Sequence, residues 1–221
     1  MDKPVITTLA IGVDYRKGLS KCFESKRAYA EKHGYRYIQG GEEYWDRRKP
    51  TAWSKIPFLL SVCADVPEDT LIWQSDADVL ITNPELTIEN VMVPLLPEGK
   101  DMLLTLDACG TINSGNILLR NTAWTRDFLG RVYLQTQFTY HIWWEQAAIV
   151  SLYESNPNDN RMIEVTRNHK AFNAYLRGLP GEPLWEQGDF LVHFAGVYNP
   201  KDMEELTDKI LAGETPRLSM G

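Results

Sequence analysis

The segment Thr70-Leu71-Ile72-Trp73-Gln74-Ser75-Asp76-Ala77-Asp78 joins an apolar, β-branched run to two carboxylates separated by one small residue. The apolar run predicts a buried β-strand. In an extended segment, Asp76 and Asp78 would point to the same side, and Ala77 would let a ligand approach them closely. Hard carboxylate oxygens suit Mn²⁺ or Mg²⁺. The segment therefore predicts a divalent-cation site at the end of a strand.

The two-aspartate pattern is weak evidence when it stands alone. Short motifs of this kind recur by chance in any chain rich in acidic residues. The alternative interpretation is a turn that ends the strand, with Asp76 and Asp78 both facing solvent. The surrounding sequence has to decide between the two.

Strand-like and helix-like segments alternate along the whole chain. Apolar or β-branched runs predict further strands over 5–12, 35–38, 102–106, 115–120 and 190–194. Apolar residues spaced three or four apart predict helices over 15–33, 53–64, 122–135, 141–153 and 201–212. The polar stretch 40–51 is expected to be a loop. This alternation predicts an α/β fold with a mostly parallel central sheet flanked by helices, in which ligands bind at the carboxyl ends of strands.

Composition indicates a globular domain. The chain has 221 residues, of which 43% are hydrophobic and 24% charged, so one domain over 1–221 is expected. A net charge of −7 without a basic face argues against nucleic acid as a partner. No run approaches the roughly 20 apolar residues that span a membrane, and no signal peptide is visible. These features predict a soluble, intracellular, cytoplasmic protein.

Cysteine usage agrees with that expectation. Cys22, Cys63 and Cys109 are odd in number and widely spaced, so they form neither a disulfide framework nor a C-x-x-C metal pair. We expect them to be reduced thiols of the core. The short basic run 47–49 is expected to be either a solvated loop or an anion contact.

Seven tryptophans are many for a chain of this length. Trp45, Trp143, Trp144 and Trp185 are candidates for a wall on which sugar rings stack. Core packing is the alternative for each of them.

Five short blocks occur in an order that one family shares. They are 55–60 (Lys-Ile-Pro-Phe-Leu-Leu), 72–78 (Ile-Trp-Gln-Ser-Asp-Ala-Asp), 113–121 (Asn-Ser-Gly-Asn-Ile-Leu-Leu-Arg-Asn), 144–148 (Trp-Glu-Gln-Ala-Ala) and 193–196 (His-Phe-Ala-Gly). In this order the chain resembles glycosyltransferase family 34, which includes fungal α-galactosyl- and mannosyltransferases and plant xyloglucan xylosyltransferases. It is more distantly similar to glycogenin-like enzymes.

The resemblance covers roughly residues 5–200 and implies a fold. That fold is a single GT-A domain with a Rossmann-like, mostly parallel central sheet. It also implies a nucleotide-binding half over about 1–110 and a sugar and acceptor half over about 111–221.

The resemblance implies a metal site and a nearby cation. Asp76, Asp78 and His193 match the family's metal ligands, and Mn²⁺ accepts imidazole as well as carboxylate. A single histidine on an apolar strand would otherwise be read as a core residue. Lys55 matches a lysine that faces the donor, where it would neutralise phosphate charge. Its alternative is an ordinary lysine on a helix surface.

The resemblance also implies contacts to the donor nucleotide and sugar. Gly12 would permit close backbone approach, Tyr15 would stack on the base, and Asn113 would offer both a donor and an acceptor to sugar hydroxyls. For Asn113, a turn before a strand is the alternative. The remaining implied donor contacts are Leu9, Ala10, Ile11, Ala77, Gly115 and Gly196.

Glu145 and Gln146 are the catalytic candidates. They match a pair, Asp-Gln in most relatives, that touches the transferred sugar. The longer glutamate is a departure from the family pattern. A second departure concerns a lysine that follows the H-F-x-G block in many relatives, for which the nearest match here is Lys201. A third concerns the N-terminal membrane anchor that eukaryotic members usually carry, which we expect this chain to lack.

The activity implied is a metal-dependent glycosyl transfer. A hexose or pentose would move from a nucleotide-sugar, by family a UDP-sugar, to a glycan, glycoconjugate or other hydroxyl acceptor with retention of configuration. Mn²⁺ or Mg²⁺ would stabilise the leaving diphosphate, and Glu145 would stabilise the transition state or act as a transient nucleophile. An inverting transferase and a non-catalytic nucleotide- or carbohydrate-binding relative remain alternatives. A haloacid-dehalogenase-like phosphatase is disfavoured because its D-x-D follows the first strand.

Overall fold

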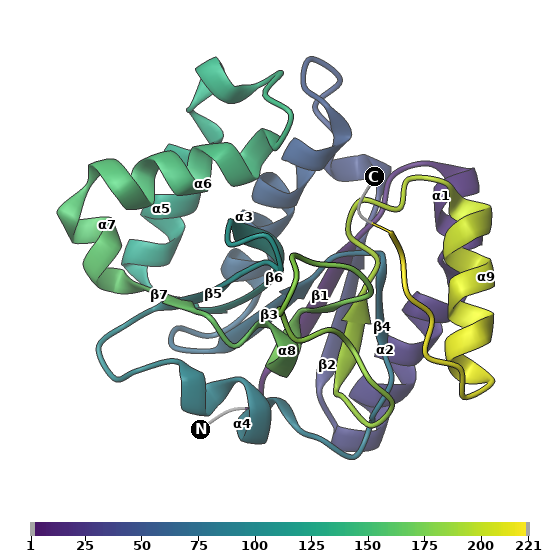
Figure 1. Cartoon of the computed structure of the whole chain (residues 1–221). Helices are drawn as coiled ribbons and strands as arrows, with labels where there is room; N and C mark the ends of the chain where they lie inside the picture. The colour runs from purple at the N-terminus through teal and green to yellow at the C-terminus, as the bar shows by residue number, and fades with distance from the viewer. Residues whose placement is uncertain (1–2, 220–221) are drawn as a thin grey trace.

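A six-stranded sheet forms the centre of the computed structural model, which describes residues 3–219 (Figure 1). The expected domain over 1–221 therefore has two residues at each end outside the description. The strand order is β2-β1-β3-β6-β5-β7. These strands are β1 (Val5–Leu9), β2 (Arg36–Gly40), β3 (Leu71–Ser75), β5 (Met102–Leu106), β6 (Ile112–Arg120) and β7 (Ile163–Thr166).

The sheet is mostly parallel, as the sequence predicts. β1 pairs in parallel with β2 and β3, and β5 pairs in parallel with β7. β6 is the reversed strand and pairs antiparallel with both β3 and β5. The central sheet takes strands from both expected halves, so it marks no boundary between them. The division into a nucleotide half and a sugar half stays a prediction.

Helices cover both faces of this sheet (Figure 1). Ile72 of β3 packs in the core cluster shared with three helices, α3 (Lys55–Asp65), α5 (Ala123–Tyr133) and α6 (Trp144–Ser155). Its neighbour Trp73 packs on the opposite face with α2 (Ser20–His33) and α4 (Ile88–Val91). Burial on both faces explains why the central strands read as continuous apolar runs.

A second, three-stranded sheet lies beside the carboxyl end of β3. Its order is β4-β9-β8, formed by β4 (Val79–Ile81), β9 (Leu191–His193) and β8 (Ala174–Tyr175). β4 follows β3 directly after the two aspartates, and β9 pairs antiparallel with β4 so that His193 lies opposite Val79. This pairing brings a histidine from late in the chain to the end of β3.

The other elements are short or peripheral. They are α1 (Val13–Gly18), α7 (Pro157–Met162), α8 (His169–Phe172), α9 (Pro200–Leu211) and the 3₁₀ turns Glu42–Tyr44, Thr51–Ser54, Val93–Leu95 and Thr136–Phe138. In the part of the chain that the structure describes, no helix has both the length and the apolar composition to cross a bilayer.

One predicted helix is in fact two. The segment 15–33 divides at Leu19, whose φ of −106° and ψ of 12° separate α1 from α2. A Cβ on Gly18 would lie 2.5 Å from the Cβ of Pro200, so this glycine permits α1 to pack against the start of α9. Tertiary packing therefore overrides the helical spacing at this point.

One of the three cysteines is not a core residue, and burial decides between the two alternatives for Trp185. Cys22 and Cys63 are buried thiols as expected, but Cys109 is exposed in the turn between β5 and β6. Trp185 is completely buried, so core packing holds for it and a sugar-stacking role does not.

Candidate active site

A cleft of about 510 Å³ lies over the carboxyl ends of β1 and β3. It contains every residue expected in the site except Gly12, namely Leu9, Ala10, Ile11, Tyr15, Lys55, Asp76, Ala77, Asp78, Asn113, Gly115, Glu145, Gln146, His193 and Gly196. Gly12 does not line the cleft. It has a φ of 102° and donates its backbone N–H to Glu42 Oε1 at 3.0 Å. Six segments far apart in the sequence thus meet in one cleft.

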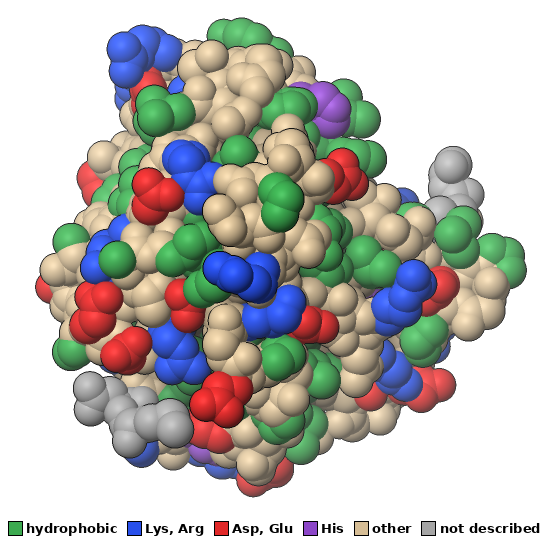
Figure 2. Space-filling model, turned by 90° about the vertical axis from the view of Figure 1, so that its left-hand side faces the viewer, with side chains coloured by type: hydrophobic (Ala, Val, Ile, Leu, Met, Phe, Trp, Pro, Cys, Tyr) green, Lys and Arg blue, Asp and Glu red, His purple; other side chains and the backbone are tan. Residues whose placement is uncertain are grey.

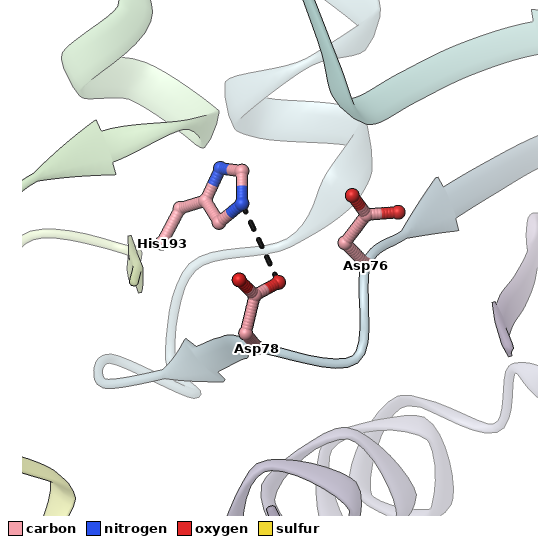
Figure 3. Close-up of side chains that lie close together, drawn as sticks. All are labelled: Asp76, Asp78 and His193. Carbon is pink, nitrogen blue, oxygen red and sulfur yellow. Dashed lines mark ion pairs between the residues drawn. The ribbon is translucent and has the colours of Figure 1, made fainter. Parts of the chain in front are cut away.

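Asp76, Asp78 and His193 converge in this cleft (Figure 3). One ligand atom from each residue lies within 4.8 Å of the others, and His193 Nε2 is 3.4 Å from Asp78 Oδ1. Burial opposes ionisation of Asp78, but the neighbouring His193 and Lys26 outweigh burial and hold the pKa of this carboxyl below its ordinary value. Two carboxylates and one imidazole form a donor set that suits a divalent cation.

The backbone that carries these aspartates is a turn, so the expected extended segment is wrong. β3 ends at Ser75, and the Val79 N–H donates back to Asp76 O at 3.3 Å. The turn between β3 and β4 sets the two carboxylates near each other. The alternation of side chains along a strand is not the cause.

Lys26 of α2 holds this turn in place. Its side chain is 0% exposed, and its Nζ donates to the backbone oxygens of Asp76 at 2.8 Å, Ala77 at 3.3 Å and Val79 at 2.7 Å. Burial lowers the pKa of Lys26 to about 8 even though nearby Asp78 opposes the shift. Sequence reasoning missed this residue. The available signal was a lysine on the apolar stripe of a predicted helix.

Lys55 connects the Asp76–Asp78–His193 cluster with Glu145. Its Nζ lies 2.9 Å from Asp76 Oδ1 and 2.9 Å from Glu145 Oε1, and donates to the Ser114 carbonyl at 3.0 Å. Lys55 is 6% exposed, so it is not an ordinary surface lysine. Burial disfavours its charge, but the carboxylates of Asp76 and Glu145 outweigh burial and raise the pKa of the ammonium above its ordinary value.

Glu145 is a buried carboxylate with one unused oxygen. Burial raises the pKa of Glu145 while Lys55 opposes the shift. Its Oε2 has no hydrogen-bond partner among residues 3–219. The preceding Trp144, at the start of α6, has a φ of 45°, an unusual backbone conformation for a tryptophan. Unpartnered buried oxygens and strained backbone both concentrate at functional sites.

Gln146 and Asn113 are held in fixed orientations. Gln146 Oε1 accepts the Ser114 N–H at 3.1 Å, and Asn113 Oδ1 accepts the Gly115 N–H at 2.8 Å. Asn113 and Gly115 lie within β6, which starts at Ile112, so the alternative of a turn before the strand is wrong. A Cβ on Gly115 would lie only 2.2 Å from His193 Cε1, so glycine makes room for the imidazole.

Two of the candidate tryptophans lie at the cleft. Trp143 and Trp144 line it and are 44% and 37% exposed. Trp45 does not line the cleft. Its indole N–H donates to Lys49 O at 3.1 Å within the polar loop. Lys201 lies on the exposed start of α9 and does not line the cleft.

Several cleft residues lie outside the five sequence blocks. They include Pro50, Thr51, Ala52, Asp107, Ile142, Val197, Tyr198 and Met203. Asp107 directly follows β5, so a search for acidic residues after each predicted strand would have found it. The others come from loops and helices whose approach depends on the tertiary fold.

The surface beside β7 and α7 carries side chains of both charges. Lysine and arginine side chains are interspersed there with acidic ones (Figure 2). No single-sign field of the kind that steers a charged polymer covers this face.

Solved structures identify the class of fold. A glycosyltransferase involved in glycosylation of the major capsid of PBCV-1 is similar with a TM-score of 0.74 at 16% identity, over 93% of this chain and 99% of that chain. The galactosyltransferase LgtC, solved with donor and acceptor sugar analogues, is similar with a TM-score of 0.56 at 12% identity, over 92% and 95%. The fold is that of the GT-A glycosyltransferases.

Within that class, the chain belongs to the galactosyl transferase GMA12/MNN10 family, whose sequence profile matches residues 5–98 and 95–204. An α-1,2-galactosyltransferase of Schizosaccharomyces pombe is 24% identical over 219 residues, covering 82% of this chain and 57% of that protein. Xyloglucan 6-xylosyltransferase 4 of Arabidopsis thaliana is 27% identical over 118 residues, covering 50% and 22%. The chain thus spans little more than half of the first relative and less of the second. The family resemblance seen in the five blocks is confirmed.

Proposed function

We propose that this protein is a metal-dependent glycosyltransferase. It moves a hexose or pentose from a nucleotide-sugar to a hydroxyl of a glycan or glycoconjugate. The family resemblance favours a UDP-sugar as the donor. The observation that carries the proposal is the meeting of Asp76, Asp78 and His193 in a cleft that also holds the Lys55–Glu145 pair. A cation site beside a buried ion pair suits the cleavage of a sugar–diphosphate bond.

The donor set supports the choice of cation. The lowered pKa of Asp78 keeps this side chain a carboxylate. The imidazole of His193 joins the two aspartates, and Mn²⁺ accepts an imidazole ligand more readily than Mg²⁺ does. A bound cation supplies Lewis-acid stabilisation of the charge that gathers on a leaving diphosphate. Because Gly115 has no side chain, the imidazole of His193 can lie close to β6, as this cluster requires.

Lys55 and Glu145 are the residues that we propose act on the donor. Lys55 carries a fixed positive charge, which stabilises negative charge developing in a water-poor cleft. Glu145 Oε2 is free to stabilise an oxocarbenium-like transition state or to bond transiently to the anomeric carbon. A transient bond to Glu145 gives retention by two successive inversions, and a stabilised oxocarbenium-like transition state gives retention when the acceptor attacks from the face that the diphosphate leaves. We propose retention as the stereochemical outcome. A product of inverted configuration by NMR would contradict it.

We propose that the acceptor lies against the exposed tryptophans of the rim. Exposed aromatic rings offer flat apolar faces to sugar rings. Beyond Trp143 a second hollow of about 430 Å³ continues along α6, and it is lined by Phe138, His141, Trp143, Ala147, Val150, Ser151, Glu154 and Ser155. Because Trp143 borders both spaces, a glycan longer than one sugar can extend from the cleft into the hollow.

The experiment is a thermal-shift and turnover panel of nucleotide-sugars with and without Mn²⁺. We expect UDP and one or more UDP-sugars to raise the midpoint of unfolding only when Mn²⁺ is present, with slow hydrolysis of the accepted donor. Asp78→Ala should abolish the effect, whereas Asp127→Asn, on the exposed side of α5, should not. Metal-independent UDP binding that Asp78→Ala leaves unchanged would overturn the proposal. Metal-dependent binding without any turnover would indicate a non-catalytic relative.

A further inference from the structure

A chain of buried amides lies behind the imidazole of His193. His193 Nδ1 is 2.8 Å from Asn173 Oδ1, and the same oxygen accepts from Asn116 Nδ2 at 2.9 Å. Asn116 Oδ1 in turn accepts from the indole N–H of Trp73 at 3.0 Å. Trp73, Asn116 and Asn173 are 0% exposed and His193 is 4% exposed. Every hydrogen bond in the chain is therefore shielded from water.

The indole fixes the direction of this chain. The Nε1–H of tryptophan can only donate, so the oxygen of Asn116 must face it and the amide nitrogen of Asn116 must face Asn173. Asn173 consequently presents its oxygen, not its nitrogen, to Asn116 and His193.

A second donor fixes Asn173 from its other side. The backbone N–H of Gly115 donates to Asn113 Oδ1 at 2.8 Å, and a backbone N–H cannot accept. Asn173 Nδ2 donates to that same Asn113 oxygen at 3.0 Å. Two independent donor-only groups, one indole and one backbone amide, therefore impose the same orientation on the Asn173 side chain.

We propose that Asn173 is a positioning residue that holds neutral His193 in the Nδ1–H tautomer. An amide oxygen can only accept, so the proton of the neutral imidazole must lie on Nδ1. The lone pair then lies on Nε2, the atom that faces Asp78 at 3.4 Å (Figure 3). When the ring is neutral, the third cation-binding atom of the site therefore faces the Asp78 carboxylate, where a cation would lie. Only the consequence for cation binding rests on the proposed function.

The tautomer can be measured directly without metal. In ¹⁵N-labelled, metal-free protein, at a pH where the ¹⁵N chemical shifts show the ring to be neutral, long-range ¹H–¹⁵N correlations report which ring nitrogen is protonated. The spectrum of His193→Gln assigns the His193 signals among the four histidines. We expect protonated Nδ1 and unprotonated Nε2. Protonated Nε2 in the wild type would overturn the proposal, whether or not the protein is a transferase.

Three variants test the consequence for metal binding. Asn173→Leu removes the acceptor, and we expect Mn²⁺ affinity to fall roughly 10- to 100-fold, as is usual when the partner of a ligating histidine is lost. Asn173→Asp keeps an oxygen acceptor toward Nδ1, so neutral His193 should stay in the Nδ1–H tautomer, while loss of the donation to Asn113 Oδ1 should make the fold less stable.

Asn121→Leu is the matched control for a lost buried amide. Asn121 is 1% exposed and its Nδ2 donates to the backbone oxygens of Cys63, Val66 and Pro67. This variant should unfold more easily but bind Mn²⁺ normally when folded. Wild-type affinity in Asn173→Leu, or an equal loss in Asn121→Leu, would overturn the positioning role. Absence of Mn²⁺ binding in the wild type would instead contradict the proposed function.

Discussion

Lys55 and Glu145 form a buried ion pair in which the lysine Nζ lies 2.9 Å from Glu145 Oε1. Both residues are less than 10% exposed, and the same Nζ lies 2.9 Å from Asp76 Oδ1. One ammonium group therefore balances a carboxylate of the candidate metal cluster and the candidate catalytic carboxylate. Each partner depends on the others to remain charged away from water.

Lys55→Met should destabilise the protein. Removing the cation leaves Glu145 and Asp76 without their partner in a buried site, which costs about 3–5 kcal/mol when one member of a buried pair is lost. Urea unfolding measures the change. The double variant Lys55→Met/Glu145→Gln should recover part of the loss because it removes one uncompensated charge. A change below about 1 kcal/mol would show that the pair behaves like an exposed one.

Glu145→Gln should impair turnover more than folding or donor binding. Glutamine keeps an oxygen acceptor for Lys55 but removes the negative charge that we propose stabilises the transition state. We expect kcat to fall about 10²–10³-fold, the range typical of losing one electrostatic contact to a transition state. Calorimetry of Mn²⁺ and UDP binding supplies the control, and it should be nearly unchanged. Wild-type kcat would rule out a catalytic role for this carboxylate.

Lys26→Met should weaken both the fold and the binding of Mn²⁺. The substitution leaves the backbone oxygens of the β3–β4 turn buried without their donor, and each such loss costs about 1–3 kcal/mol. Lys32→Met is a control on the same helix, since Lys32 pairs with Glu85 at the exposed surface and should contribute less than about 1 kcal/mol. Unfolding curves and Mn²⁺ titration measure the two effects. Equal stability losses in both variants would contradict a special role for Lys26.

Trp143→Ala should weaken acceptor use without changing donor hydrolysis. The loss of one stacking face is worth about 0.5–1.5 kcal/mol, which corresponds to a rise in acceptor KM of about 2- to 12-fold. Initial rates with a glycan acceptor, compared with hydrolysis of the donor alone, separate the two. Trp45→Ala, which removes a tryptophan outside the cleft, is the control. An equal loss of donor hydrolysis in Trp143→Ala would place this tryptophan on the donor side.

The three cysteines should differ in reactivity. Cys109 is exposed and should react with iodoacetamide in the native protein, which peptide mass spectrometry detects. Burial raises the pKa of the Cys22 and Cys63 thiols to about 11 from 9.0, so both should react only after unfolding. Labelling of Cys22 as fast as Cys109 would contradict this burial.

The same thiols predict a pH dependence of stability. Between about pH 9 and 11 the native state keeps protons that the unfolded chain releases, so their contribution to the free energy of unfolding falls as pH rises. Cys22→Ala/Cys63→Ala should show a smaller fall over this range than the wild type. An identical slope in both proteins would contradict the raised pKa values.

The predictable parts of the fold are its long, strongly apolar elements. β1, β3 and β5 follow from continuous apolar runs, and the helices α3, α5 and α9 follow from apolar residues three or four apart. β4 and β8 were missed because strands of three and two residues are too short to show a period. β7 is only partly buried, and it forms because β5 offers it an edge for pairing.

The sequence by itself determined which residue types could bind a cation and a diphosphate, and in what order along the chain they occur. Asp76, Asp78, Lys55, Glu145 and His193 were all expected from four of the five blocks, and all line one cleft. This was possible because the order of the blocks resembles that of one family, whose pattern implies the roles of Lys55, Glu145 and His193.

Only the tertiary structure decided how those groups face one another. The pairing of β4 with β9 brings His193 to the turn after β3, and Lys26 fixes that turn from a helix early in the chain. Asn173 sets the direction of the imidazole through hydrogen bonds to residues distant in sequence. Strand pairing and buried hydrogen bonds join residues that are far apart along the chain, so no local pattern could reveal them.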